Sequence, residues 1–105
     1  GMVGLETAFG VCYTKLCREQ CLPLELLSFL MSAGPAAVLG LAGHKGLLAP
    51  GYDADVVLAD LDHMYQVKAE ELHSKSKNCP YDGAYLFGRV VTTIKGGKIT
   101  WQIEE

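Results

Sequence analysis

The sequence lacks the uninterrupted apolar run of about 18–20 residues that a membrane-spanning helix requires. Its most apolar stretch, Leu24 to Leu41, is interrupted by Glu25, two serines, Gly34 and Pro35, and predicts buried helices instead. A secretory signal, with a basic start followed by an apolar core, is not recognisable either. We interpret the opening Gly1-Met2 as a cleavage scar before an initiator methionine.

A long run of one charge sign is also missing. The formal net charge is -3, and the densest basic cluster is Lys75-Ser76-Lys77, which is typical of a solvated turn. Proteins that bind nucleic acid or anionic membranes usually carry a basic patch. We therefore expect neither a nucleic-acid partner nor a membrane partner.

The cysteines and histidines do not occur in the closely spaced pairs that are typical of metal sites. A C-x-x-C or H-x-x-x-H pair, which would indicate zinc, does not occur. Cys17 and Cys21 stand four apart and would share a helix face, yet reduced thiols of a cytoplasmic protein explain the cysteines better. The full set is Cys12, Cys17, Cys21 and Cys79, with His44, His63 and His73 scattered among other segments.

Aspartates flank one predicted strand. Asp53 and Asp55 lie at its start, and Asp60 and Asp62 lie at its other end. A calcium or magnesium site needs more oxygen ligands than such a pair supplies. Aspartate side chains also bond to backbone amides one or two residues on in turns, and we favour that role for Asp53 and Asp55. Ser74 and Ser76 have no general base in a recognisable motif.

The order of patterns predicts an α+β chain that divides near residue 43. Apolar residues at helical spacing, Phe9, Cys12, Tyr13 and Leu16, predict a helix over Glu6–Gln20. Pro23 opens a second helix, Gly34 is expected to end it, and Pro35 to begin a third that runs to about Leu41. The third helix is apolar almost all round and is expected to be buried on several sides.

After residue 43 the patterns predict strands. Ala54–Leu61 is expected to be buried on both faces because its apolar residues are consecutive. Tyr65–Val67 and Tyr85–Ile94 are further predicted strands, with a helical turn at Ala69–Leu72. Gly96 and Gly97 predict a tight hairpin turn rather than a phosphate loop. Ile99, Trp101 and Ile103 alternate with polar residues, which predicts a half-buried strand.

Four spaced motifs resemble dihydroorotases and related cyclic amidohydrolases. The first is Val3-Gly4-Leu5-Glu6-Thr7-Ala8. The second, from Lys45-Gly46 through Pro50-Gly51-Tyr52-Asp53-Ala54-Asp55, resembles the amidohydrolase signature KG-x-(I/L)-x-PG-x-DAD-x-V. The third, His73 to Gly83, resembles SKS-x-NTPF-x-G, with Cys79 and Tyr81 in place of Thr and Phe. The fourth is the closing hairpin, Gly88 to Lys98.

The resemblance implies a (β/α)₈ barrel flanked by a β-sandwich built from both chain ends. It also implies one or two zinc ions that activate water, held by an H-x-H pair, a carboxylated lysine, two further histidines and an aspartate. None of these ligands matches a position here, and the aspartate would precede Val3. We therefore assign no catalytic, cofactor-binding or metal residue to this chain. Residues 1–43 are expected to resemble the last helices of an incomplete barrel, and residues 44–105 part of the sandwich.

The sequence thus predicts a cytoplasmic, C-terminal piece of a dihydroorotase-like enzyme that is inactive alone. A complementing subunit of a split amidohydrolase, working with a barrel-bearing chain, is the alternative. A hydantoinase or allantoinase fragment and an unrelated binding module are also considered. Because strand edges are left open, we expect a homo-oligomer that forms through those edges or through exchanged elements.

Overall fold

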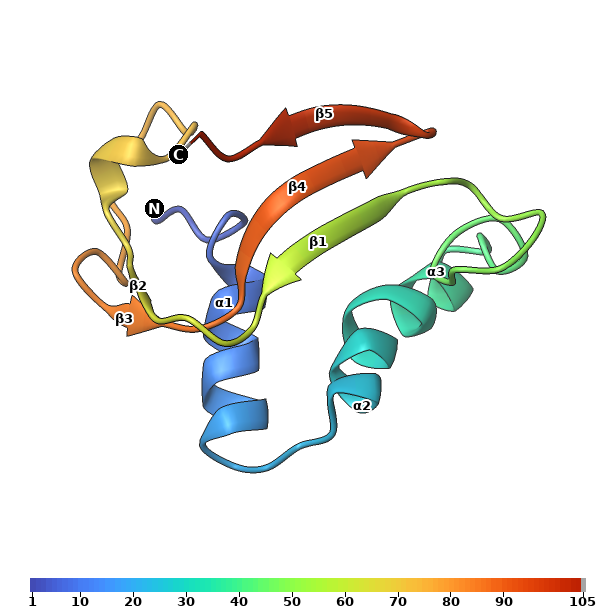
Figure 1. Ribbon diagram of the computed structural model, residues 1–105, viewed down its shortest axis with the longest axis horizontal. Coiled ribbons are helices and arrows are strands. Elements are labelled where there is room, and N and C mark those ends of the chain that lie inside the picture. Colours follow the sequence, from blue (N-terminus) through green and yellow to red (C-terminus); the bar gives the residue numbers. More distant parts are fainter. Residues whose placement is uncertain (105) are drawn as a thin grey trace.

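The computed structural model describes residues 1–104, in which helices come first and antiparallel sheets follow (Figure 1). Helix α1 (Ala8–Cys12) continues as a π-helical segment, η1 (Tyr13–Arg18). A second helical arm consists of α2 (Leu24–Ser28), η2 (Phe29–Ala33) and α3 (Gly34–Val38). The predicted α+β class is confirmed.

The helical arm does not break at Gly34, so the expected end of a helix there is wrong. Gly34 has helical dihedral angles, φ -61° and ψ -55°, and α3 follows η2 directly. A proline inside a helix lacks an N–H and clashes with the preceding turn. The wider π-helical turn of η2 ends at Ala33, and Pro35 then lies in the first turn of α3, where proline is tolerated. A glycine before it avoids the clash between the proline ring and a Cβ.

Two sheets follow the helices. The larger has the antiparallel order β1-β4-β5, formed by β1 (Val56–Asp60), β4 (Arg89–Lys95) and β5 (Lys98–Gln102). The smaller pairs β2 (Tyr65–Gln66) with β3 (Tyr85–Leu86), and a 3₁₀ turn, η3 (Ala69–Glu71), lies between them in sequence. The predicted hairpin turn is confirmed, with positive φ at Gly96 and Gly97.

The predicted strand Tyr85–Ile94 is divided into β3 and β4 by a break at Phe87 and Gly88. Gly88 has φ 82°, a conformation that glycine adopts without steric cost. The chain therefore turns a corner there and leaves the small sheet for the large one. A side chain at position 88 would also press on the ring of Tyr13, 3.1 Å away.

Burial is much lower than the sequence predicts for β1, β5 and the end of the arm. Val57 and Leu58 are 53% and 52% exposed, although β1 was expected to be buried on both faces. Val38 is 87% exposed, although α3 was expected to be buried on several sides. Every residue of β5 is exposed. The physical reason is that residues 1–104 provide no second layer to cover these surfaces.

A small apolar core lies beside the smaller sheet. It consists of Val67, Ala69, Cys79 and Leu86, with Val11, Tyr65 and Leu72 packed against it. In the helical arm, Leu27 of α2 is 1% exposed.

The first helix meets the sheets through Thr14. The Thr14 hydroxyl donates to the carbonyl oxygen of Phe87 (3.1 Å), and its Oγ1 accepts from the Phe87 N–H (2.8 Å). Thr14 and Gly10 are the buried positions of this helix, whereas the predicted apolar face, Phe9 to Leu16, is only half-buried. Below Thr14, the Arg18 guanidinium lies 3.7 Å from the centre of the Phe87 ring. The helix is therefore fixed at the corner between β3 and β4.

Replacing Thr14 by valine should lower the free energy of unfolding by about 1–3 kcal/mol, because both backbone groups of Phe87 lose their partner. Thr14→Ser keeps the hydroxyl and removes one methyl group, so it should cost about 1 kcal/mol or less. Urea unfolding of the three proteins measures the difference. An unchanged stability in Thr14→Val, together with a loss in Thr14→Ser, would show that the methyl group matters and the hydrogen bonds do not.

Candidate functional site

The histidines lie apart, and two of them contact carboxylates. His63 Nδ1 lies 2.9 Å from Asp60 Oδ2, and His73 Nδ1 lies 2.6 Å from Glu6 Oε1. The His73 backbone N–H also donates to Glu6 Oε2 at 2.9 Å. Glu6 therefore ties the loop after η3 to the segment before α1.

Asp60 closes a turn, a role that the sequence pattern favoured for Asp53 and Asp55. Its Oδ1 accepts the backbone N–H groups of Asp62 (3.0 Å) and His63 (3.2 Å). These amide donors, Asp62 first, and the His63 ring hold the pKa of the Asp60 carboxyl below its ordinary value.

Asp53 and Asp55 share one lysine. Lys45 Nζ lies 2.9 Å from Asp53 Oδ2 and 2.6 Å from Asp55 Oδ2. The other Asp55 oxygen accepts the Gly96 N–H at 2.9 Å. The Lys45 hydrogen bond, followed by that from Gly96, lowers the pKa of Asp55, and the same contact with Asp55 raises the pKa of Lys45. Asp53 and Asp55 therefore make contacts within this chain.

The zinc centre that the resemblance implies does not fit the described side chains. Among residues 1–104, no three His, Cys, Asp or Glu side chains come together closely enough to hold a metal ion. All four cysteines are free. Cys21 does not share a helix face with Cys17, because η1 ends at Arg18 and Cys21 has φ 58°.

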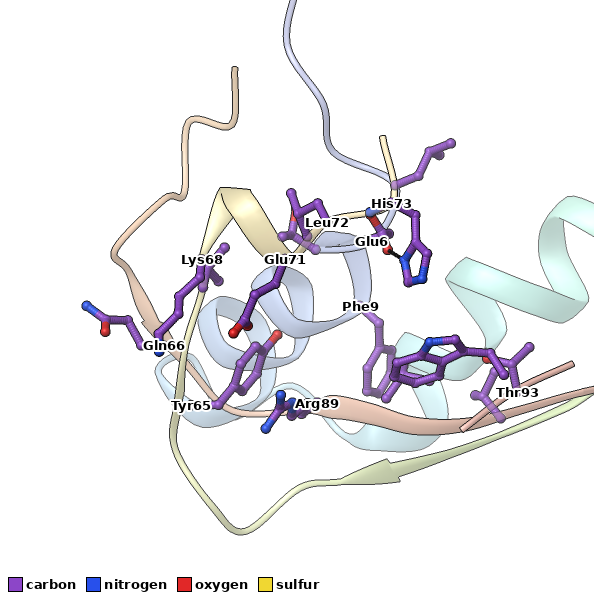
Figure 2. Close-up of a pocket in the computed structure, with 16 residues that line it drawn as sticks. Glu6, Phe9, Tyr65, Gln66, Lys68, Glu71, Leu72, His73, Arg89 and Thr93 are labelled. Atoms are coloured by element: carbon purple, nitrogen blue, oxygen red, sulfur yellow. Dashed lines mark hydrogen bonds and ion pairs between the residues drawn. The ribbon is translucent and has the colours of Figure 1, made fainter. Parts of the chain in front are cut away.

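A cleft of about 530 Å³ lies between the start of α1, the large sheet and η3 (Figure 2). Sequence reasoning missed this cleft, because its walls come from segments far apart in the chain. Its floor includes the row Val57, Thr93 and Trp101, which lie opposite one another across the three strands of the large sheet. The lining residues include Glu6, Phe9, Tyr65, Lys68, Glu71, His73 and Arg89.

Tyr65 lines the cleft from β2. Burial raises the pKa of its hydroxyl, and the Arg89 guanidinium lies 5.5 Å from the ring centre. The hydroxyl also lies so close to Gly10 that a Cβ there would overlap it. Tyr65 thus packs the small sheet against α1. The cleft offers apolar surface and dispersed charges, which suits packing better than bond cleavage.

No helix within residues 1–104 has both the length and the apolar character needed to cross a bilayer.

Comparison with known proteins gives one consistent result. A family model described as "Amidohydrolase family" matches residues 1–101. Dihydroorotase of Clostridium botulinum is 49% identical over 102 residues, which cover 97% of this chain and 25% of the relative. Dihydroorotase of Lactobacillus johnsonii is 38% identical over 103 residues, which cover 97% and 24%. The chain spans about a quarter of the length of the curated relatives it matches.

Solved structures agree. An L-hydantoinase (dihydropyrimidinase) from Arthrobacter aurescens superposes with a TM-score of 0.92 and 34% identity, covering 100% of this chain and 23% of that chain. A D-hydantoinase from a Bacillus sp. has a TM-score of 0.84, with 90% of this chain and 20% of that chain covered. At 24% identity, this second likeness shows the fold alone.

The Asp55 contacts predict an acid-dependent stability. Because the folded-state pKa of Asp55 is lowered, its contribution is fully present above the unfolded value, about 3.9, and is lost as pH falls through the folded value. The difference in unfolding free energy between the parent chain and Asp55→Asn should therefore be positive at pH 7 and shrink below about pH 4.

Thermal or urea unfolding between pH 2.5 and 7 measures that difference. Glu70→Gln is the matched control, because the exposed Glu70 lies on η3, outside the contacts of Lys45. A difference between parent and Asp55→Asn that stays constant over this range would contradict the assignment.

Proposed function

The chain belongs to the amidohydrolase family, and on this basis we propose that it forms part of a dihydroorotase-like cyclic amidohydrolase. The observation that carries the proposal is the 49% identity to a dihydroorotase over nearly the whole chain. The parent reaction would be zinc-dependent hydrolysis of the cyclic amide of dihydroorotate, a step of pyrimidine biosynthesis. Likeness to an L-hydantoinase at 34% identity makes hydantoin-type cyclic amides the second candidate substrate class.

We further propose that this chain does not catalyse the reaction alone. Hydrolysis of an amide by a metal-activated water needs a fixed metal site and a base near the reacting carbonyl. His63 and His73 are instead paired with carboxylates of this chain, and Asp55 is paired with Lys45. These contacts support a structural role for the acidic and basic groups that the sequence drew attention to.

The exposed apolar surface supports a place within a larger assembly. Val38, Leu39 and Leu48 are 87%, 73% and 79% exposed, and Phe29 and Leu30 are more than half exposed. Apolar side chains that form a continuous exposed surface are normally covered by a partner. The remaining three quarters of an amidohydrolase, in the same chain or in a complementing one, would provide the cover.

The four free cysteines support a reducing compartment, so we propose that the protein acts in the cytoplasm.

The isolated chain is expected to show no dihydroorotate hydrolysis and to retain less than one zinc ion per chain after dialysis. Ultraviolet absorbance follows turnover, and atomic emission measures zinc, with an intact dihydroorotase assayed in parallel as positive control. Turnover together with stoichiometric zinc in the isolated chain would overturn the proposal.

The genomic sequence upstream of Met2 distinguishes a piece of one longer enzyme from a complementing subunit of a split enzyme. A continuous reading frame that encodes an H-x-H motif and a barrel would indicate one longer enzyme. A separate barrel gene without this segment would indicate a complementing subunit, and co-expression of the two chains should then restore hydrolysis.

A further inference from the structure

The amidohydrolase-like motif from Lys45 to Asp55 takes no part in the proposed chemistry, yet its residues contact three separate parts of the fold. Lys45 follows the helical arm, Asp53 and Asp55 precede β1, and Gly96 lies in the turn between β4 and β5. We propose that Lys45, Asp55 and Gly96 form a joint that fixes the orientation of the α2–η2–α3 arm relative to the large sheet.

The sheet side of the joint is held by backbone as well as charge. Asp55 accepts the Gly96 N–H, and the neighbouring Gly97 N–H donates to the Ala54 carbonyl oxygen at 2.9 Å. The hairpin turn is thereby tied to the residues that enter β1. Because β4 pairs with β1 along its length, this contact fixes Asp55 relative to the whole sheet.

The arm side is held by close packing at Gly46. A Cβ on Gly46 would lie 3.0 Å from both the Ala33 Cα and the Ala36 Cβ, so the loop backbone rests directly on the junction of η2 and α3. Lys45, the next residue back, reaches from this contact to Asp55. The Asp53 N–H also donates to the His44 carbonyl oxygen at 2.7 Å, which closes the loop on itself. Figure 1 shows α3 beside the loop that leads into β1.

The two ends of the arm are therefore held differently. The α2 end contacts η1 and contains the buried Leu27, whereas α3 is mostly exposed. The joint is the contact that places the α3 end. Exposed ion pairs contribute little to stability because water screens them, and the Lys45 and Asp55 side chains are 40% and 36% exposed. Its effect is thus on orientation more than on overall stability.

Residual dipolar couplings of backbone amides test the joint on the isotope-labelled 105-residue chain. In the parent protein, one alignment tensor should fit the amides of residues 24–38 and of β4 and β5. In Lys45→Met, the couplings of residues 34–38 should depart from that tensor and decrease in size. Lys15→Met is the control, because Lys15 forms an exposed ion pair with Glu19, 3.0 Å apart, that joins no separate elements.

A second pair of variants tests the packing side. Gly46 and Gly51 both have positive φ, 100° and 88°, so alanine strains the backbone at either position. Only the side chain at position 46 would strike the arm, since nothing lies within 4 Å of a Cβ at position 51. Gly46→Ala should therefore disturb the couplings of α3, and Gly51→Ala should leave them unchanged.

Three results would overturn the proposal. The first is a single tensor in Lys45→Met, and the second is equal loosening in Lys15→Met. The third is loss of the dispersed amide spectrum in Lys45→Met, which would make the pair a requirement for folding instead of orientation. None of these results depends on hydrolytic activity, so failure of the proposed function would leave the joint untouched.

Discussion

The arrangement of helices and sheets depends on how the backbone of Phe87 is satisfied. Phe87 stands at the break between β3 and β4, where its N–H and carbonyl oxygen belong to neither ladder. A partly buried backbone group without a partner is costly. Thr14 supplies both a donor and an acceptor from the first helix, so the helix has one position at this corner. Gly10 and Arg18, one turn away on either side, pack against Tyr65 and the Phe87 ring.

Local patterns were enough to predict much of the fold. Two consecutive glycines indicated the hairpin turn, and a run of consecutive apolar residues indicated β1. Thr14 could not be recognised as a buried anchor, because its partner is 73 residues away and a polar residue on a helix usually faces solvent. The continuous helix through Gly34 depends on a π-helical turn, for which periodicity gives no signal. The break at Phe87 likewise depends on contacts with the first helix.

The candidate site was likewise predictable from the sequence only in part. Motif resemblance indicated the family. The turn chemistry favoured for Asp53 and Asp55 is instead observed at Asp60. The partner of Asp55 was not predicted, because Lys45 lies ten residues earlier and Gly96 lies 41 residues later. The assignment of no catalytic residue to this chain stays a prediction. Exposed apolar residues on the arm and on β1 explain why a chain of this length would need further layers around it.

Amide hydrogen exchange followed by NMR tests most directly the claim that Thr14 holds the helix on the sheets. The Phe87 N–H should exchange only on global unfolding, as slowly as the amides in the centre of β4. Amides of the exposed β5 strand that do not pair with β4 should exchange much faster. A Phe87 amide that exchanges as fast as those would contradict the account, because the corner would then open without the rest of the fold.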